Sequence, residues 1–268
     1  MSRVRLDPDS IPRGEIFVSS VERPDPPLPG YNKGAIIPVL DSLRPIDEIP
    51  GLYDKLVAEP DTPSSVLIER VCLSDRMLKA VMFLSVQTEL TGKLEAMRQV
   101  FEAGMPGTSI KYANTRSAEP GFLVGTIDPA PGERLWKFVG LHLDNRDSLA
   151  CANRANSHRR IVVNVGPGGR WGLFCMTDAI EVAERLGHGP EHVPRGSLFG
   201  EFVDTYPGEV QCIWIPVPAG SGYVANTDLL LHDGSTFDAT ESSAAVALLG
   251  HWERGSLAKS QLASTQGD

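Results

Sequence analysis

The stretch VGLHLDN, residues 139–145, places a histidine and an aspartate in an otherwise apolar run. Side chains of an extended strand alternate between its two faces, so His142 and Asp144 share one face and Leu143 takes the other. Two polar groups on a buried face cost free energy unless they are paired or bound to something. A metal ion that takes both side chains as ligands would remove this cost, and it would need a third ligand from elsewhere in the chain.

From residue 108 to residue 254 the chain consists of short apolar segments separated by Gly and Pro, such as RRIVVNVG, RWGLFCM and VQCIWIPV. This pattern predicts a series of strands. The sequence GPGGR, residues 166–170, lies between two of them. It lacks the Lys-Ser/Thr helix start of a phosphate loop, so we interpret it as a hairpin turn. Thr177 and Asp178 precede AIEVAERLG and predict a capped helix in an insert over residues 177–204.

The first part of the chain has a different character. Residues 1–62 are rich in Pro and Gly, which predicts irregular chain with a short helix near residues 46–57. Asp61-Thr62-Pro63 has the sequence of a helix start. Apolar residues then recur every three or four positions as far as Phe101, which is the helical period. We therefore expect one long helix, or two joined near residues 73–75.

These patterns together predict an α+β protein with a double-stranded β-helix core, a jelly roll of the cupin kind. We expect a single domain over residues 1–268. Its parts are an irregular N-terminal segment with a helical scaffold (1–107), the core with its helical insert (108–254) and a polar tail (255–268).

Composition limits the function. The net charge is −9, which argues against nucleic-acid binding because that needs a basic surface. The N-terminal residues contain no apolar signal segment, and no apolar run approaches 18 residues, so we expect neither a signal peptide nor a membrane span. The four cysteines are scattered without a CxxC pair. We expect them to be free buried thiols in a reducing cytoplasm.

A candidate third ligand is His232, which follows three leucines in LLLHDGST and opens into a turn. An apolar strand of this kind delivers a polar side chain to the mouth of a barrel. His188 and His192 are four residues apart, but Gly and Pro between them break the helix that a zinc-binding pair needs. The alternative is that Asp144 pairs with Arg146 or nearby backbone, and that His232 is a buried histidine at a strand end.

Two imidazoles and one carboxylate bind Fe(II) on one face of an octahedron and leave three positions open. A bidentate 2-oxo acid can take two of these positions and O₂ the third. His142, Asp144 and His232 have the residue types that this chemistry requires.

The HLD sequence followed by a late strand histidine resembles the Fe(II)/2-oxoglutarate-dependent dioxygenase superfamily. The stretch GYVANTDLLLHDGST, residues 222–236, resembles small bacterial members that act on amino acids or amino-acid-like intermediates of natural-product pathways. The resemblance implies that His142, Asp144 and His232 bind iron, with 2-oxoglutarate and O₂ as co-substrates. Related halogenases carry a small residue where Asp144 stands, so the resemblance implies hydroxylation, desaturation or cyclisation in specialised metabolism.

One feature departs from the superfamily, which anchors the distal carboxylate of 2-oxoglutarate on a basic residue soon after the second histidine. Here that region reads FDATESSAAV and contains no basic residue. Our first choice of anchor is Arg254, which keeps an Arg-Gly-Ser setting, and our second is Arg160. Further candidates for the co-substrate site are His251, Ser235 and Thr236.

The substrate residues are harder to identify. Arginine suits a carboxylate and aspartate suits an ammonium group, so a mixture of the two with asparagine would fit an amino-acid-like zwitterion. On this basis the candidates are Asn145, Arg146, Asn226, Asp228 and Arg116. Two other function classes stay open: a cupin-type metal enzyme that does not use 2-oxoglutarate, and a non-catalytic jelly-roll binding domain. The sequence fixes neither the substrate nor the oligomeric state.

Overall fold

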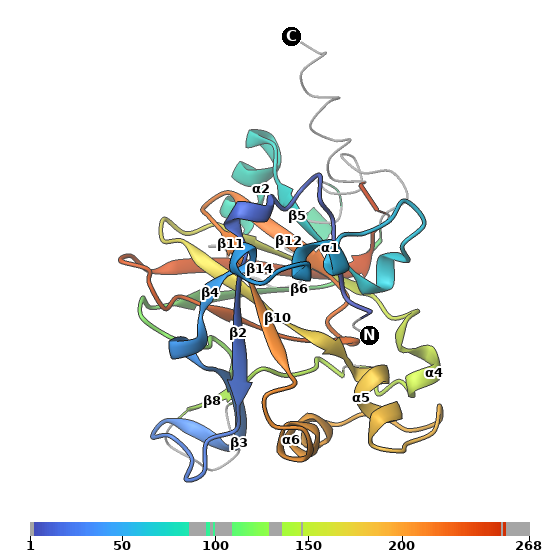
Figure 1. Ribbon diagram of the computed structural model, residues 1–268. Helices are drawn as coiled ribbons and strands as arrows, with labels where there is room; N and C mark the ends of the chain where they lie inside the picture. The colour runs from blue at the N-terminus through green and yellow to red at the C-terminus, as the bar shows by residue number, and fades with distance from the viewer. Residues whose placement is uncertain are drawn as a thin grey trace.

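The computed structural model describes residues 3–85, 95, 96, 99, 109–128, 136–145, 147–252, 254 and 255. This part of the chain forms two β-sheets with few helices, a mixed α+β structure (Figure 1). The mixed α+β class predicted from the sequence is therefore confirmed.

Neighbouring strands in the first sheet are, in order, β1 (Arg5–Leu6), β5 (Leu67–Cys72), β12 (Ser221–Ala225), β9 (Arg159–Asn164), β14 (Ser243–His251) and β6 (Ser109–Ala118). In the second sheet the order is β13 (Leu230–Ser235), β10 (Arg170–Asp178), β11 (Gln211–Val217), β2 (Phe17–Glu22), β3 (Tyr31–Pro38), β8 (Lys137–Gly140) and β7 (Ile127–Asp128), with β4 (Arg44–Pro45) paired to β2. From β9 to β14 the chain passes repeatedly between the two sheets. This is consistent with the predicted jelly-roll core.

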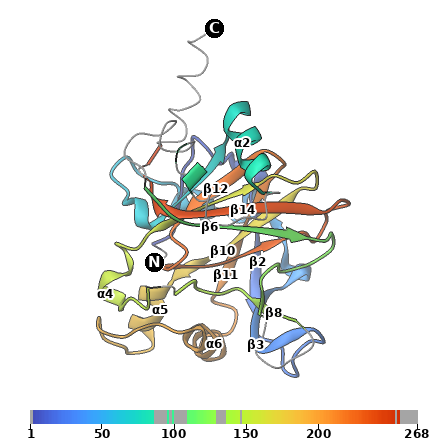
Figure 2. The ribbon, with the colours of Figure 1, turned by 180° about the vertical axis from the view of Figure 1, so that it is seen from behind.

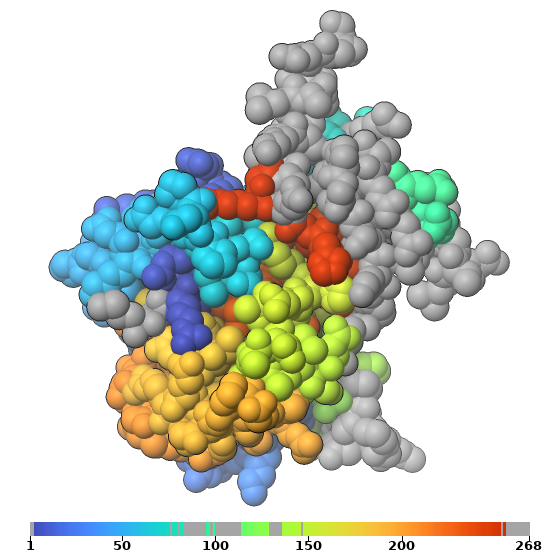
Figure 3. All heavy atoms as spheres, turned by 90° about the vertical axis from the view of Figure 1, so that its right-hand side faces the viewer, coloured from blue at the N-terminus to red at the C-terminus, as the bar shows by residue number. Residues whose placement is uncertain are grey.

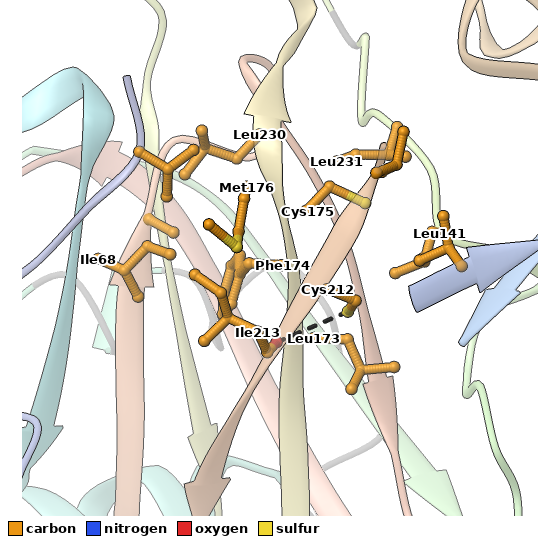
Figure 4. Packing of buried hydrophobic residues seen from close by; sticks show 14 of the residues in the cluster. Ile68, Leu141, Leu173, Phe174, Cys175, Met176, Cys212, Ile213, Leu230 and Leu231 are labelled. Atoms are coloured by element: carbon orange, nitrogen blue, oxygen red, sulfur yellow. Dashed lines mark hydrogen bonds between the residues drawn. The ribbon is translucent and has the colours of Figure 1, made fainter. Parts of the chain in front are cut away.

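The apolar core includes β10, β11 and β13, whose buried Leu, Ile, Phe and Cys side chains pack together (Figure 4). Phe174 and Trp214 are almost completely buried, and burial of a large apolar side chain contributes roughly 1.5–3 kcal/mol. The indole Nε1–H of Trp214 donates to Ser19 Oγ at 3.0 Å, so its one polar group is satisfied. Cys175 and Cys212 lie opposite each other on β10 and β11 as free buried thiols.

Free thiols were predicted for all four cysteines, and the structure confirms them. Cys151 is buried like Cys175 and Cys212, whereas Cys72 is exposed, contrary to the prediction.

The N-terminal helical scaffold is not confirmed. Residues 5–45 contribute β1 to β4, and β2 pairs with β11 inside the second sheet. The predicted helix start at Asp61-Thr62-Pro63 leads instead into a single 3-10 turn, η4 (Ser64–Val66), and then into strand β5. Strand β5 lies between β1 and β12, where Leu67 and Ile68 are fully buried, so sheet pairing overrides the local helix signals.

Helices occur where several other patterns indicated them. The short helix predicted near residues 46–57 corresponds to η3 (Ile46–Glu48) and α1 (Leu52–Leu56). The apolar 3–4 period gives α2 (Asp75–Ser85), and most of its predicted continuation falls outside the described residues. The remaining short 3-10 turns are η1 (Arg13–Glu15) and η2 (Leu40–Ser42). None of the helices among the described residues combines the length and apolar character needed to cross a bilayer.

The helical insert contains α5 (Ala179–Arg185) and α6 (Gly196–Thr205), which lie together at the end of the molecule opposite α2 (Figures 1 and 2). The Asp178 carboxylate caps α5 as predicted, because it accepts hydrogen bonds from the backbone N–H groups of Ile180 and Glu181 at 2.9 and 2.8 Å. Another short helix, α4 (Cys151–Arg154), precedes β9.

The hairpin predicted for GPGGR is wrong, since β9 and β10 belong to different sheets and residues 166–170 cross between them. The crossing runs close against the backbone before β14. A Cβ atom on Gly168 would lie 2.0 Å from the carbonyl oxygen of Glu241, and one on Gly166 would lie 2.3 Å from the amide nitrogen of Ala244. Glycine is therefore required here by close approach of two backbones.

A buried ion pair ties β5 to β9. Arg159 Nη2 lies 2.6 Å from Glu69 Oε2, and both side chains are under 10% exposed. The same guanidinium donates to the carbonyls of Leu67 and Trp252, while the other carboxylate oxygen of Glu69 accepts from the Gly255 amide. Removing one partner would leave the other charge buried without compensation.

We expect Glu69→Ala to lower the free energy of unfolding by about 3–5 kcal/mol, because Arg159 would lose its counter-ion inside the fold. Urea denaturation measures this change. The matched control is Glu184→Ala, which breaks an exposed pair with Arg3 and should cost less than about 1 kcal/mol. Equal effects from the two variants would contradict the assignment of Glu69 as a buried structural charge.

Candidate metal and co-substrate site

The site is built on one backbone pairing. His142 and His232 face each other in an isolated antiparallel bridge, in which each amide donates to the other residue's carbonyl, at 3.1 and 2.9 Å. Residues paired in this way hold their Cβ atoms about 5 Å apart on the same face. The two imidazole centroids are 4.7 Å apart. Asp144 is fixed beside them because its amide donates to the Thr227 carbonyl at 3.1 Å.

This geometry differs in detail from the regular strand expected for the stretch 139–145. Strand β8 ends at Gly140, which has φ +82°, and the chain bends at Leu141 before His142 forms its isolated bridge. A Cβ atom at Gly140 would lie 2.4 Å from the Ile36 carbonyl oxygen, so only glycine fits there. The predicted shared face of His142 and Asp144 is nevertheless present.

The ligand-type atoms of His142, Asp144 and His232 all lie within 4.8 Å of one another. The Nδ1 atoms of His142 and His232 lie 2.9 and 3.2 Å from the carbonyl oxygens of Gly140 and Leu230. If Nδ1 of each ring donates to its carbonyl, Nε2 carries a free lone pair for a metal.

The charge state also suits a metal. Burial lowers the pKa of His232 to about 3, although Asp144 acts in the opposite direction, so the ring is neutral near pH 7. Burial alone would raise the pKa of Asp144, but His232, Arg160 and His142 outweigh it and lower the pKa overall. The carboxylate is therefore ionised. Its Oδ2 atom has no hydrogen-bond donor, although Arg160 Nη2 lies 2.6 Å away as an ion-pair partner.

A cavity of about 180 Å³ opens onto these three side chains. Its floor and walls come from both sheets. It is lined by Asn114, Arg116, Ser117, Ala118, Gly125, Thr126, His142, Asp144, Arg160, Val162, Arg170, Tyr223, His232, Asp233, Gly234, Ala245 and Ala247.

Arg170, the first residue of β10, is a half-buried cation of this cavity, and the sequence analysis did not single it out. Its Nη1 atom has no hydrogen-bond partner within the described part of the chain. Burial lowers its pKa, but an arginine remains charged in proteins. The guanidinium lies over Gly234, where a Cβ atom would be 2.3 Å from Arg170 Nη2. Tyr223 lies nearby, and burial raises its pKa to about 12, so its phenol is a neutral donor.

Arg170 was overlooked because it ends the GPGGR sequence, which was interpreted as a hairpin turn. The sequence did contain a usable signal. Every second side chain of a buried apolar strand faces the interior, and the arginine at the start of such a strand can be one of them. Only the pairing of β10 with β13 shows that this interior is the one that contains His232.

Of the residues proposed for the co-substrate, only Arg160 lines the cavity. Arg254 is wrong as an anchor, because its guanidinium donates to the carbonyls of Glu59 and Pro60 and to Asp7 at the protein surface. The other three candidates are not in the lining either: the hydroxyls of Ser235 and Thr236 donate to the carbonyls of Phe122 and Glu119, and the ring of His251 packs on that of His158 at 4.5 Å.

Among the residues proposed for the substrate, Arg116 lines the cavity. Arg146 lies outside the described residues. Asn145, Asn226 and Asp228 do not line the cavity and instead belong to a buried network centred on Arg154. These three predictions are corrected for the same physical reason: the polar groups are already occupied by hydrogen bonds within the fold.

Arg154 is completely buried and joins four segments of chain. Its guanidinium donates to the carbonyls of Leu149, Asp228 and Pro194 and to the side-chain oxygen of Asn145. Asn145 directly follows Asp144, and Asp228 lies just before β13, which carries His232. Arg154 therefore holds in place the two backbone segments that position these candidate metal ligands. Figure 3 shows the segment after Asp144, in yellow-green, lying against the α5–α6 segment in gold, which contains Pro194.

Comparison with known proteins gives a distant likeness. No family model matches the chain, and no curated protein matches it. Solved structures of the Kdo hydroxylase KdoO, a non-heme Fe(II) alphaketoglutarate-dependent dioxygenase, do match. The cobalt(II) complex has 17% sequence identity and a TM-score of 0.33, covering 63% of this chain and 62% of that one.

The KdoO complex with alphaketoglutarate and Fe(III) has 16% identity and a TM-score of 0.33, covering 63% of this chain and 65% of that one. A further KdoO structure contains succinate and Fe(III). The matched region spans less than two thirds of the length of the first two structures. The likeness is too distant to assign a function, which depends on the side chains of the site itself.

We expect Arg154→Lys to lower the free energy of unfolding by at least about 2 kcal/mol, because one ammonium group cannot reach four separated acceptors. Urea denaturation and amide hydrogen exchange test this. Exchange at the amides of Asp144 and Leu230 should accelerate more than exchange in β11. The exposed Arg195→Lys is the control and should change stability by no more than about 0.5 kcal/mol. Unchanged protection at Asp144 would show that Arg154 stabilises the fold without positioning this ligand.

Proposed function

We propose that this protein is an Fe(II)/2-oxoglutarate-dependent oxygenase. One observation carries the proposal: two imidazoles and an ionised carboxylate converge in a cavity that is also lined by Arg170, whose buried Nη1 atom has no hydrogen-bond partner among the described residues. The first group has the composition of a facial Fe(II) site. The second has the charge and shape to bind a carboxylate in bidentate fashion.

His142, Asp144 and His232 are the proposed metal ligands. The fit rests on the Nε2 positions of the two rings, which donation from Nδ1 leaves free, and on the ionised carboxylate beside them. Bound Fe(II) would supply O₂ activation, which couples oxidation of 2-oxoglutarate to succinate and CO₂ with oxidation of a substrate C–H bond. Asp144 occupies the position that halogenases leave open for a halide, so we assign oxygenation and not halogenation.

Arg170 is the proposed anchor for the distal carboxylate of 2-oxoglutarate. Phe174 pairs with His232 in the β10–β13 ladder, and Arg170 lies four residues earlier on β10. At about 3.4 Å per residue this separates their backbones by roughly 14 Å along the strand. An arginine side chain and a five-carbon diacid chelated to the metal together span such a distance. The Tyr223 phenol can donate a second hydrogen bond to the same carboxylate.

Arg160 has a different role in this proposal. Its guanidinium is paired with the Asp144 carboxylate at 2.6 Å, on the wall opposite β10 and β13. The pair keeps Asp144 ionised and limits the rotation of its carboxylate, so a ligand oxygen remains directed at the metal position.

The runner-up, a cupin-type metal enzyme without 2-oxoglutarate, was favoured by the lack of a basic residue after His232. Under this proposal, Arg170 supplies that cation from a different strand, so the lack of a basic residue after His232 no longer favours the alternative. A non-catalytic jelly-roll domain does not account for an arginine in the same cavity whose Nη1 atom is buried without a hydrogen-bond partner among the described residues. The finer expectations stay predictions: an amino-acid-like substrate, desaturation or cyclisation in place of hydroxylation, a place in specialised metabolism, and a cytoplasmic location.

We expect His142→Ala, Asp144→Ala and His232→Ala each to abolish Fe(II) binding while the fold is kept. Anaerobic Fe(II) titration in the presence of 2-oxoglutarate, followed by the visible metal-to-ligand charge-transfer band, measures this. His251→Ala is the matched control, because this histidine lies outside the cavity and should leave the band unchanged. Retention of wild-type iron affinity by any of the three variants would remove that residue from the ligand set.

We expect Arg170→Gln to weaken 2-oxoglutarate binding by about 30-fold or more, since loss of a bidentate charged contact costs about 2–5 kcal/mol. Titration of 2-oxoglutarate into the Fe(II)-loaded protein, followed by the same band, measures the affinity. Affinity for Fe(II) alone should be nearly unchanged.

Two further variants sharpen this test. Gly234→Ala keeps the charge but places a methyl group against the guanidinium, so it should weaken 2-oxoglutarate binding in the same direction. Arg254→Gln removes a surface arginine and should have no effect. If Arg254→Gln weakens binding and Arg170→Gln does not, the anchor has been assigned to the wrong arginine.

A further inference from the structure

The described walls of the cavity carry three arginines and two aspartates. Arg170 lies deep, Arg160 lies beside Asp144, and Arg116 lies on β6, the edge strand of the first sheet. Arg116 is exposed and has no hydrogen-bond or ion-pair partner among the described residues, unlike Arg160. A guanidinium that faces a ligand cavity without a partner is available to a ligand.

The acidic groups of the described lining are already engaged. Asp144 is paired with Arg160 and is a proposed metal ligand. Asp233 accepts hydrogen bonds from the amides of Gly125, Thr126 and Gly234 and from the Thr126 hydroxyl, so its carboxylate is directed at the cavity wall. The described lining therefore offers no free carboxylate to an ammonium group.

The region around Arg116 also has space. Asn114, Arg116 and Ala118 alternate along β6 and share its inward face. Arg116 is paired with Ala245 of β14, and Asn114 with Ala247, so the neighbouring strand presents only methyl groups beside them. Strands β6 and β14 run side by side across the molecule (Figure 2). The two alanines leave room for the body of a ligand above β14, with polar donors along one edge.

Charge balance points in the same direction. With metal and co-substrate bound, the positive charges of the divalent cation and Arg170 would equal the negative charges of Asp144 and the two carboxylates of 2-oxoglutarate. These groups together would therefore be neutral. Arg160 and Arg116 then remain as excess positive charge, and Asp233 offsets at most one of them. A cavity with a net positive potential favours an anionic ligand.

We infer that the oxidised substrate is an organic acid whose carboxylate is bound at the cavity mouth by Arg116, with Asn114 as a second donor. The inference rests on the proposed function. It also revises the zwitterion expectation: the carboxylate half retains a partner in Arg116, whereas Asp228, expected to bind the ammonium, is buried outside the lining. The substrate class is thus a carboxylate without a requirement for a free amine.

The test uses three small probes of similar shape: propanoate, propanamide and propylammonium. Each is added to protein saturated with Mn(II) and 2-oxoglutarate, and the paramagnetic relaxation of the probe's methyl protons is measured by NMR, because this readout detects weak binding close to the metal. Propanoate should show saturable relaxation and the other two probes should not. Arg116→Gln should reduce the propanoate effect at least about tenfold, and Arg116→Glu should transfer the preference to propylammonium.

Arg116 is exposed on an edge strand, so these substitutions leave the core intact, and Arg195→Gln is the control for loss of an exposed arginine elsewhere. Equal relaxation of propanoate and propanamide, absence of relaxation for all three probes, or an undiminished propanoate effect in Arg116→Gln would each overturn the subsite. Failure of the proposed function is separate and visible beforehand, because the Fe(II)–2-oxoglutarate charge-transfer band would then not form in the wild-type protein.

Discussion

The reciprocal backbone hydrogen bonds between His142 and His232 are the constraint on which the site depends. They join the chain after β8 to strand β13. This backbone pairing alone places the two rings on the same face, and no contact between side chains is needed. Asp144 follows because the next amide along the same extended segment bonds to Thr227. Gly140 makes the approach possible, since any side chain there would collide with the Ile36 backbone. The positions of all three side chains are thus consequences of backbone pairing.

The second element is the guanidinium of Arg170. Its Nη1 atom is buried and has no hydrogen-bond partner in the described part of the chain, and a buried donor without an acceptor costs free energy. Under the proposed function, a bound dicarboxylate would give this nitrogen an acceptor and would stabilise the folded protein by mass action. The same strand pair supplies both ends of the proposed co-substrate site, the metal end through His232 and the anchor end through Arg170. In the proposed function, the spacing along the β10–β13 strand pair therefore sets the length of diacid that can reach from the metal to the anchor.

Sequence reasoning predicted the α+β class, the shared face of His142 and Asp144, and the convergence of His232 on them, because period-two alternation and an apolar run before a histidine are local signals. It failed where partners distant in sequence decide the structure. Residues 67–72 were assigned to a helix but form a strand, since β1 and β12 pair with it on both sides. Arg254 and Arg170 were misjudged for the same reason. The sheet to which a strand belongs, and hence the direction of its first side chain, is settled by long-range pairing.

The connectivity of the two sheets also orders events during synthesis of the chain. His232 follows His142 by 90 residues, and the strands between them, β9 to β12, must be distributed over both sheets before β13 can bridge back. A nascent chain that has not yet reached Leu230 holds His142 and Asp144 but has no bridge to keep them in place. Long-range pairings of this kind form slowly. The three proposed ligands therefore come together only after Leu230–Ser235 has been synthesised and paired.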